Sequence, residues 1–145
     1  MYIRAKRRKE ADFNERYKNR KKIKKIKACA YVRVSTKQDE QEESFDTQMR
    51  YWEGKLKSDP SLDFVGIFSD EGISGRKVEQ RTGYQRMMEL VRQGEIDRIY
   101  VKSVSRFGRN KLEALRAIQE VRNYNAEIIF EKENLTTSDP KSSFL

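Results

Sequence analysis

The residues of this chain with the most specific chemistry are one serine and a group of arginines. Ser35 lies in the run Tyr-Val-Arg-Val-Ser-Thr at residues 31–36, directly after a short apolar segment. The chain contains no histidine, which excludes a Ser-His-Asp triad within it. A second cluster, residues 103–110, carries Arg106 and Arg109 at the expected start of a helix. Arginine neutralises the negative charge of a phosphoryl transition state and binds its oxygens bidentately. The first hypothesis is therefore phosphoryl transfer to or from serine.

Length and composition predict one domain. At 145 residues the chain has room for a single sizeable core. No apolar stretch approaches membrane-spanning length, and the basic N-terminus lacks the apolar run of a secretory signal, so we expect a cytoplasmic protein without a membrane partner. Cys29 is the only cysteine and lies in an apolar segment. It therefore predicts a buried thiol, and a disulfide framework or thiolate metal site within one chain is excluded.

The positive charge is concentrated in the first 27 residues. Residues 1–27 contain 13 Lys or Arg and 3 Asp or Glu, whereas residues 28–145 contain 19 and 20. A basic segment of this kind is typical of nucleic-acid contact, although a solvated tail that aids solubility has the same composition. We therefore divide the chain into a basic N-terminal extension, 1–27, and a core, 28–145. The candidate DNA-binding residues are Lys6, Arg7, Arg8, Lys9, Lys21, Lys22, Lys24 and Lys25.

Strand and helix patterns alternate from residue 28 onward. Residues 28–34 predict a strand buried on both faces, and Ser44 is the expected N-cap of a helix that ends near residues 58–60. A long polar loop is expected at 69–80. The other predicted elements are strands at 64–68, 96–101 and 126–131 and helices at 82–93 and about 112–121. The apolar sides of the three helices are predicted to be Phe45, Met49, Trp52 and Leu56; Tyr84, Met87, Met88 and Val91; and Leu112, Leu115, Ile118 and Val121.

This alternation predicts an α/β fold with a mainly parallel four-stranded sheet and helices on both faces. Active groups of such folds lie beyond the carboxyl ends of the strands, where Ser35, the polar loop and the 103–110 cluster should meet. If the cluster opens its helix, Arg106 and Arg109 lie near the positive end of the helix dipole, which favours a phosphate. Taken alone, Ser35 also fits a turn or cap residue, and the arginines also fit solvated or locally paired side chains.

Four segments, in order and at suitable spacing, resemble one enzyme family. They are Tyr-Val-Arg-Val-Ser-Thr at 31–36, Ser-Phe-Asp-Thr-Gln at 44–48, Asp-Glu-Gly-Ile-Ser-Gly at 70–75 followed by Arg-Thr-Gly at 81–83, and Ser-Arg-Phe-Gly-Arg-Asn at 105–110. Together they resemble the serine site-specific recombinases of the resolvase and invertase type, and most closely the large serine recombinases of mobile elements. Several motifs in order are far more specific than any one of them.

The resemblance implies a site-specific DNA recombinase that cleaves and rejoins DNA through a covalent 5′-phosphoserine intermediate. Ser35 is then the nucleophile. The other implied catalytic residues are Arg33, Gln48, Arg81, Arg106 and Arg109. No cofactor or metal is expected, and no ATP is needed because one phosphodiester replaces another.

The chain departs from the family pattern in two places. Ser105 stands where many members have an aspartate, so the proton-handling role proposed for that aspartate is not transferred. We expect Ser105 either to bond a phosphate or, as the preferred interpretation, to cap the helix. Family members also continue into a long helix for dimerisation and then into DNA-binding domains, and this chain stops about where that helix begins. We therefore expect a monomeric core, inactive in recombination by itself, of an enzyme that forms dimers or tetramers on double-stranded DNA.

Two other function classes remain open. One is a nucleotide- or phosphate-binding α/β domain in which Ser35 and the arginines contact the ligand; the lack of a Gly-rich phosphate loop after the first strand counts against it. The other is a non-catalytic DNA-binding module that depends on the basic extension. A covalent protein–DNA adduct distinguishes the recombinase from both.

Overall fold

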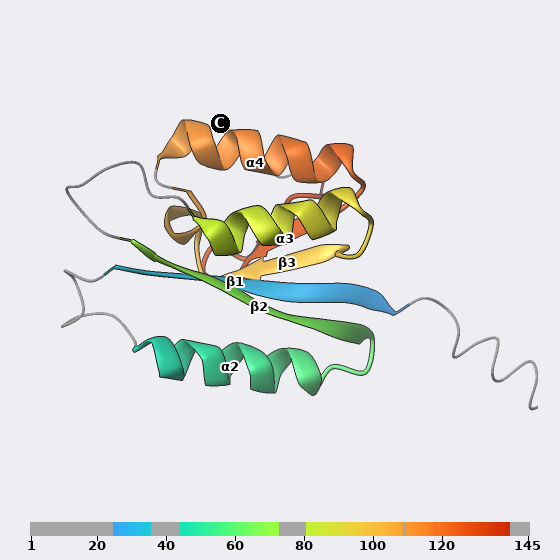
Figure 1. Ribbon diagram of the computed structural model, residues 1–145. Coiled ribbons are helices and arrows are strands. Elements are labelled where there is room, and N and C mark those ends of the chain that lie inside the picture. The colour runs from blue at the N-terminus through green and yellow to red at the C-terminus, as the bar shows by residue number, and fades with distance from the viewer. Residues whose placement is uncertain (1–24, 36–43, 73–80, 109, 140–145) are drawn as a thin grey trace, which may run out of the picture.

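A five-stranded, mostly parallel sheet forms the centre of the molecule (Figure 1). The computed structural model describes residues 25–35, 44–72, 81–108 and 110–139. The strand order is β2-β1-β3-β4-β5, and only β5 pairs antiparallel. The strands are β1 (Ile26–Ser35), β2 (Leu62–Gly72), β3 (Arg98–Val101), β4 (Glu127–Phe130) and β5 (Leu135–Thr136). The helices are α2 (Phe45–Lys57), α3 (Thr82–Arg92), the short 3-10 helix η1 (Val104–Arg106) and α4 (Lys111–Asn123).

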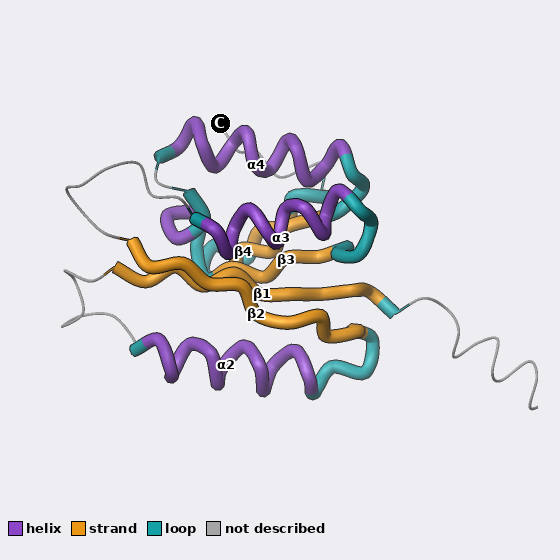
Figure 2. The backbone as a smooth tube through the Cα atoms, in the orientation of Figure 1, coloured by secondary structure: helices purple, strands orange, loops and turns teal. Residues whose placement is uncertain are grey.

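Helices cover both faces of the sheet, with α2 on one side and α3 and α4 on the other (Figure 2). The central strand β1 is buried on both faces, as its unbroken apolar run predicts. Ala28, Ala30 and Val32 pack with Trp52 and Leu56 of α2. The alternate residues of β1 face the second core, as the period of two of a strand requires.

The second core lies between the sheet and the pair α3 and α4. Cys29 and Tyr31 belong to it, together with apolar residues of both helices. Burial raises the pKa of the Cys29 thiol, so the predicted buried thiol is confirmed. The α3 and α4 residues of this core are Met87, Met88, Val91, Ala117, Ile118 and Val121.

The fold class is confirmed, and the strand count is corrected from four to five. The additional strand, β5, has two residues and pairs only with β4. Two residues are too few to produce an alternating pattern in the sequence. Among the described residues, none of the helices combines the length and the apolar character needed to cross a membrane.

The polar loop predicted at 69–80 begins later than expected. Strand β2 continues through Ser69, Asp70 and Glu71 to Gly72, because each of these residues pairs with a residue of β1 from Val32 to Ser35. Backbone pairing with a long neighbouring strand therefore overrides the polar composition. Residues 73–80, the rest of the predicted loop, lie outside the described residues.

The helix starts are set by side chains that accept backbone N–H bonds. Ser44 is the N-cap of α2 and accepts from the Thr47 N–H, as predicted. The 103–110 cluster, by contrast, does not open α4. Arg106 belongs to η1, and Asn110 is the N-cap of α4.

The predicted apolar sides of two helices are partly wrong. Phe45 of α2 is 38% exposed, and Gln48 is buried in that helix instead. Leu112 of α4 is 59% exposed, whereas Ala114 is buried. Leucine is the more apolar residue, but the small Ala114 lies where the chain before α4 approaches most closely: a Cβ on Gly108 would be 2.9 Å from the Ala114 nitrogen.

Candidate active site

The predicted nucleophile, Ser35, is the last residue of the central strand. Its backbone pairs with Gly72 at the end of β2, and Arg33 pairs with Asp70. Strand β3 pairs with β1 only as far as Tyr31 and ends at Val101. The last four residues of β1 therefore extend past β3, at the carboxyl edge of the parallel strands where α/β proteins bind their ligands.

Arg106 reaches this extension from a distant part of the chain. Its Nη1 donates to the main-chain oxygen of Arg33, at 3.4 Å and 73 residues away in sequence. Arg106 thus contacts β1 two residues before Ser35. Arg33 and Arg106 are both half-buried. Arg109, the second arginine of the cluster, lies outside the described residues.

Gln48 is buried near the start of α2, on the other side of the sheet from α3. It lines a small cavity of about 140 Å³ together with residues of α2 and of the carboxyl edge. Of these, Lys102 follows β3 directly. The complete lining is Gln48, Tyr51, Trp52, Lys102 and Glu131.

Two of the lining residues, Tyr51 and Glu131, belong to a hydrogen-bonded group that also includes Lys55. Lys55 donates to Glu131 at 2.6 Å, and the Tyr51 hydroxyl donates to the same carboxylate. Burial raises the pKa of Glu131, but the bonds from Lys55 and Tyr51 outweigh it, and the net shift is downward. The Glu131 carboxylate therefore stays charged near neutral pH. Its bonds to Lys55 and Tyr51 join α2 to the chain after β4.

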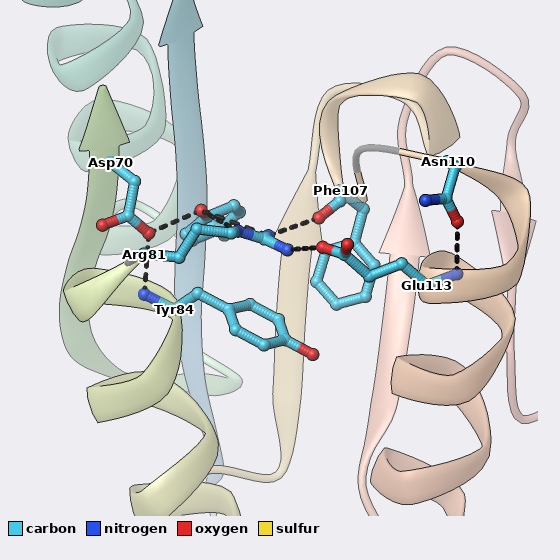
Figure 3. Close-up of polar contacts among 7 residues, drawn as sticks. Asp70, Arg81, Tyr84, Phe107, Asn110 and Glu113 are labelled. Carbon is cyan, nitrogen blue, oxygen red and sulfur yellow. Dashed lines mark hydrogen bonds and ion pairs between the residues drawn. The ribbon is translucent and has the colours of Figure 1, made fainter. Parts of the chain in front are cut away.

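Arg81 differs from the other predicted arginines because it is almost fully buried, at 6% exposure. Its Nη2 donates to the Phe107 carbonyl at 2.6 Å, and its Nη1 forms an ion pair with Glu113 (Figure 3). Nε and Nη2 also donate to the Tyr31 hydroxyl, at 3.3 Å each. The guanidinium carbon lies 4.0 Å from the centroid of the Tyr84 ring, a cation–π contact.

Asp70 and Tyr31 belong to the same group of contacts, and the sequence analysis gave neither of them a role of its own. The Tyr31 hydroxyl donates to Asp70 Oδ2 at 2.6 Å. The Asp70 carboxylate also accepts from the main-chain N–H groups of Gly83 and Tyr84, at 2.8 Å each. It therefore caps α3 from a neighbouring strand, since Arg81 at the N-cap position makes no side-chain cap. The sequence feature that could have indicated this role is that Asp70 lies inside a matched motif, 13 residues before Gly83, whose N–H it accepts.

The aromatic rings around Arg81 exclude water from it. Tyr31, Tyr84 and Phe107 contact one another edge to face, with centroids 5.8 to 6.2 Å apart. Burial, and next the bond to Asp70, raise the pKa of Tyr31. Burial also raises the pKa of Tyr84. Both phenols are therefore neutral near neutral pH, and neither supplies a phenolate that could act as a base.

Two further predictions meet the structure only in part. Ser105 caps no helix: it is exposed, and its hydroxyl lies 3.0 Å from that of Ser103. The preferred interpretation of Ser105 was therefore wrong, because Asn110 takes the cap position of α4. Of the candidate DNA-binding residues, only Lys25 is among the described residues, and it is exposed. No group of three or more Cys, Asp or Glu side chains in the described ranges is arranged to hold a metal ion.

Comparison with known proteins identifies the family of the chain. Residues 28–145 match the family described as Resolvase, N terminal domain. The chain belongs to this resolvase family. The match covers the predicted core and confirms the resemblance drawn from the motifs. A comparison with curated proteins gives no match.

Solved structures of recombinases and of an integrase share the fold. A resolvase-family site-specific recombinase from Streptococcus pneumoniae has a TM-score of 0.65 and 29% identity, over 81% of this chain and 79% of its own. The N-terminal catalytic domain of TP901-1 integrase has a TM-score of 0.57 and 26% identity, over 79% and 83%. The C-terminal catalytic domain of ISC1926 TnpA, an IS607-like serine recombinase, shares the fold at 22% identity, with a TM-score of 0.60 over 73% and 69%. This resolvase-family chain is therefore a serine recombinase catalytic domain.

Proposed function

We propose that this domain cleaves and rejoins double-stranded DNA through a covalent 5′-phosphoserine intermediate on Ser35. The observation that carries the proposal is the contact between Arg106 and the main chain of Arg33, two residues before Ser35 at the carboxyl edge of the sheet. Two of the four matched segments, 31–36 and 105–110, are in contact there. Membership of the resolvase family supports the same chemistry.

In the proposed step the Ser35 oxygen forms a bond to the phosphorus of a DNA phosphodiester, and the bond from phosphorus to the 3′ oxygen breaks. The serine loses its proton, and the departing oxygen gains one to become a 3′-hydroxyl. One phosphodiester replaces another, so the step is close to neutral in free energy and needs no nucleoside triphosphate. Attack by a 3′-hydroxyl of an exchanged end reverses the step and reseals the DNA.

Arginine side chains take the electrostatic part of this mechanism. Arg33, Arg106 and Arg109 are proposed to hold the phosphate oxygens and to neutralise their developing charge. Arginine remains protonated at ordinary pH, so it acts as a donor and not as a base. Gln48 is proposed to position the DNA by a hydrogen bond.

The division of the chain at residue 28 belongs to the same proposal. The core, 28–145, carries the chemistry, and the basic extension, 1–27, contacts DNA without sequence preference. The active enzyme is proposed to be a dimer or tetramer on its DNA site, with the isolated chain a monomer that does not recombine DNA.

A covalent adduct tests the proposal. The intact enzyme is incubated with end-labelled duplexes that carry candidate element ends, and denaturing electrophoresis detects protein attached to the 5′ end. We expect an adduct with the native enzyme, none with Ser35→Ala, and slow formation with Ser35→Cys, because only the attacking oxygen is changed. Ser105→Ala is the matched control and should form the adduct. An adduct in Ser35→Ala would move the nucleophile elsewhere, first to Thr36 or Ser105.

A further inference from the structure

The guanidinium of Arg81 is held by protein groups from three separate parts of the chain. Its hydrogen bonds join Tyr31 of β1, Phe107 after η1 and Glu113 in the first turn of α4 (Figure 3). Both terminal nitrogens and Nε have acceptors in the protein. The side chain therefore connects the strand that carries Ser35 to the segment that carries Arg106.

Phe107 links Arg81 to Arg106. Phe107 follows Arg106 directly, and its side chain is fully buried among Tyr31, Tyr84 and Phe130. Because Arg81 holds the Phe107 carbonyl, it fixes the backbone from which Arg106 extends toward β1. Arg106 in turn contacts the Arg33 carbonyl. The relative placement of Arg106 and Ser35 thus depends on a third arginine.

A phosphate can reach Arg81 only if these contacts break. Its side chain is 5% exposed, and release would remove the Arg81 donor from the buried Phe107 carbonyl and from the partly exposed Glu113 carboxylate. Leaving buried polar groups unpaired is unfavourable. Arg81 also has a left-handed backbone, with φ of 49°, a conformation that a non-glycine residue keeps only where its surroundings determine it.

We propose that Arg81 is a positioning residue that aligns Arg106 with Ser35, and that Glu113 is the partner that keeps Arg81 in that role. Glu113 supplies the negative charge that a buried guanidinium requires. The main-chain N–H of Glu113 donates to the side-chain oxygen of Asn110 at 2.8 Å. This bond holds the backbone from which the Glu113 carboxylate extends. The consequence for cleavage rests on the proposed function, but the alignment itself does not.

Two measurements on Glu113→Gln test the proposal. Glutamine keeps the shape and one oxygen acceptor but removes the charge, so the domain should remain folded. The first measurement is hydrogen exchange of the Arg106 and Phe107 amides, which bond the Ser103 and Val104 carbonyls at 3.1 Å each. The second is the rate of adduct formation at saturating DNA. DNA affinity is measured on the same enzyme.

The chain offers a matched control. Arg92 and Glu120 form a second ion pair between α3 and α4, with the carboxylate again on α4, but near the other ends of the two helices. Glu120→Gln makes the same chemical change without touching the Arg81 contacts. It should leave both the exchange of residues 106 and 107 and the cleavage rate unchanged.

We expect Glu113→Gln to exchange both amides faster and to form the adduct about tenfold to a hundredfold more slowly, the range that a displacement of about 1 Å at a reacting group produces. DNA affinity should be unchanged. Faster cleavage or tighter DNA binding would overturn the proposal, since Glu113 would then be a competitor of DNA for Arg81. Unchanged exchange would overturn it as well. If the native enzyme forms no adduct, the proposed function fails while the exchange measurement still decides the alignment.

Discussion

At the scale of single residues, the arginines of the matched motifs differ in their surroundings. Arg33, Arg81 and Arg106 all belong to the matched motifs, yet Arg81 is buried and bonded to protein, while the other two are half-buried.

The residue type at position 83 is also set by its surroundings. A Cβ at this position would lie 2.2 Å from the Ser69 oxygen, so the close approach of α3 to β2 needs glycine there.

Tyr31→Phe should lower the free energy of unfolding by about 1–3 kcal/mol at neutral pH, because a buried hydroxyl bonded to Asp70 and Arg81 is lost. Burial and the Asp70 bond raise the pKa of Tyr31 in the folded state. A group with a raised folded pKa contributes stability in full below its unfolded pKa, here the ordinary value of 10.0, and loses it at higher pH. The native and variant proteins should therefore differ below pH 10 and converge above it.

Urea unfolding at a series of pH values measures this difference. Tyr124→Phe is the control, since Tyr124 is 46% exposed, and it should match the native protein throughout. A constant difference between native and Tyr31→Phe across pH 10 would show that the hydroxyl does not titrate through folding.

At the scale of elements, the helix starts place the site residues. Ser44 starts α2 three residues before Thr47, and Gln48 follows in the first turns. Asp70 starts α3 from outside the helix, which brings β2 and α3 together at Arg81. Asn110 starts α4 and presents Glu113 to Arg81. Each of these helices therefore begins close to one residue of the candidate site or to one of its partners.

Asn110→Ala should lower the free energy of unfolding by about 0.5–2 kcal/mol, because the Glu113 N–H loses its side-chain acceptor. Asn110→Asp keeps an acceptor at the same place and should stay close to the native protein. Thermal or urea unfolding of the three proteins provides the comparison. An equal loss in both variants would mean that the amide nitrogen, and not the cap oxygen, stabilises the start of α4.

At the scale of the whole molecule, positive charge and chemistry occupy different parts of the chain. The first 27 residues carry a net charge of +10 and the remaining residues a net charge of −1, while the proposed chemistry lies in the latter part. A nearly neutral core attracts duplex DNA weakly at long range. Affinity for arbitrary DNA should therefore come from the extension.

Deleting residues 1–27 should abolish most non-specific DNA binding and flatten its dependence on salt. Each phosphate contact contributes roughly 0.9 units to the slope of log affinity against log salt concentration. Binding of both proteins to an arbitrary duplex across a salt series gives the two slopes. Equal slopes would place the DNA-binding surface in the core.

The sequence by itself determined the fold class and the order of the longer strands and helices, and it predicted the edge of the sheet at which the candidate site lies. These follow from local patterns: the apolar run of β1, the helical spacing of Met87, Met88 and Val91, and the Ser44 cap. The ordered motifs also predicted the family, because motif order is a property of the chain alone.

Only the tertiary structure decided that Asp70 lies in a strand, that Ala114 and not Leu112 is buried, and that Arg81 is bonded to protein. The partners of Arg81 lie 50, 26 and 32 positions away in sequence. Local composition cannot reveal such contacts, because whether a polar residue is solvated or buried depends on which distant groups pack against it. The difference between an arginine proposed to bind a phosphate and one proposed to align its neighbours therefore arises only when the chain is folded.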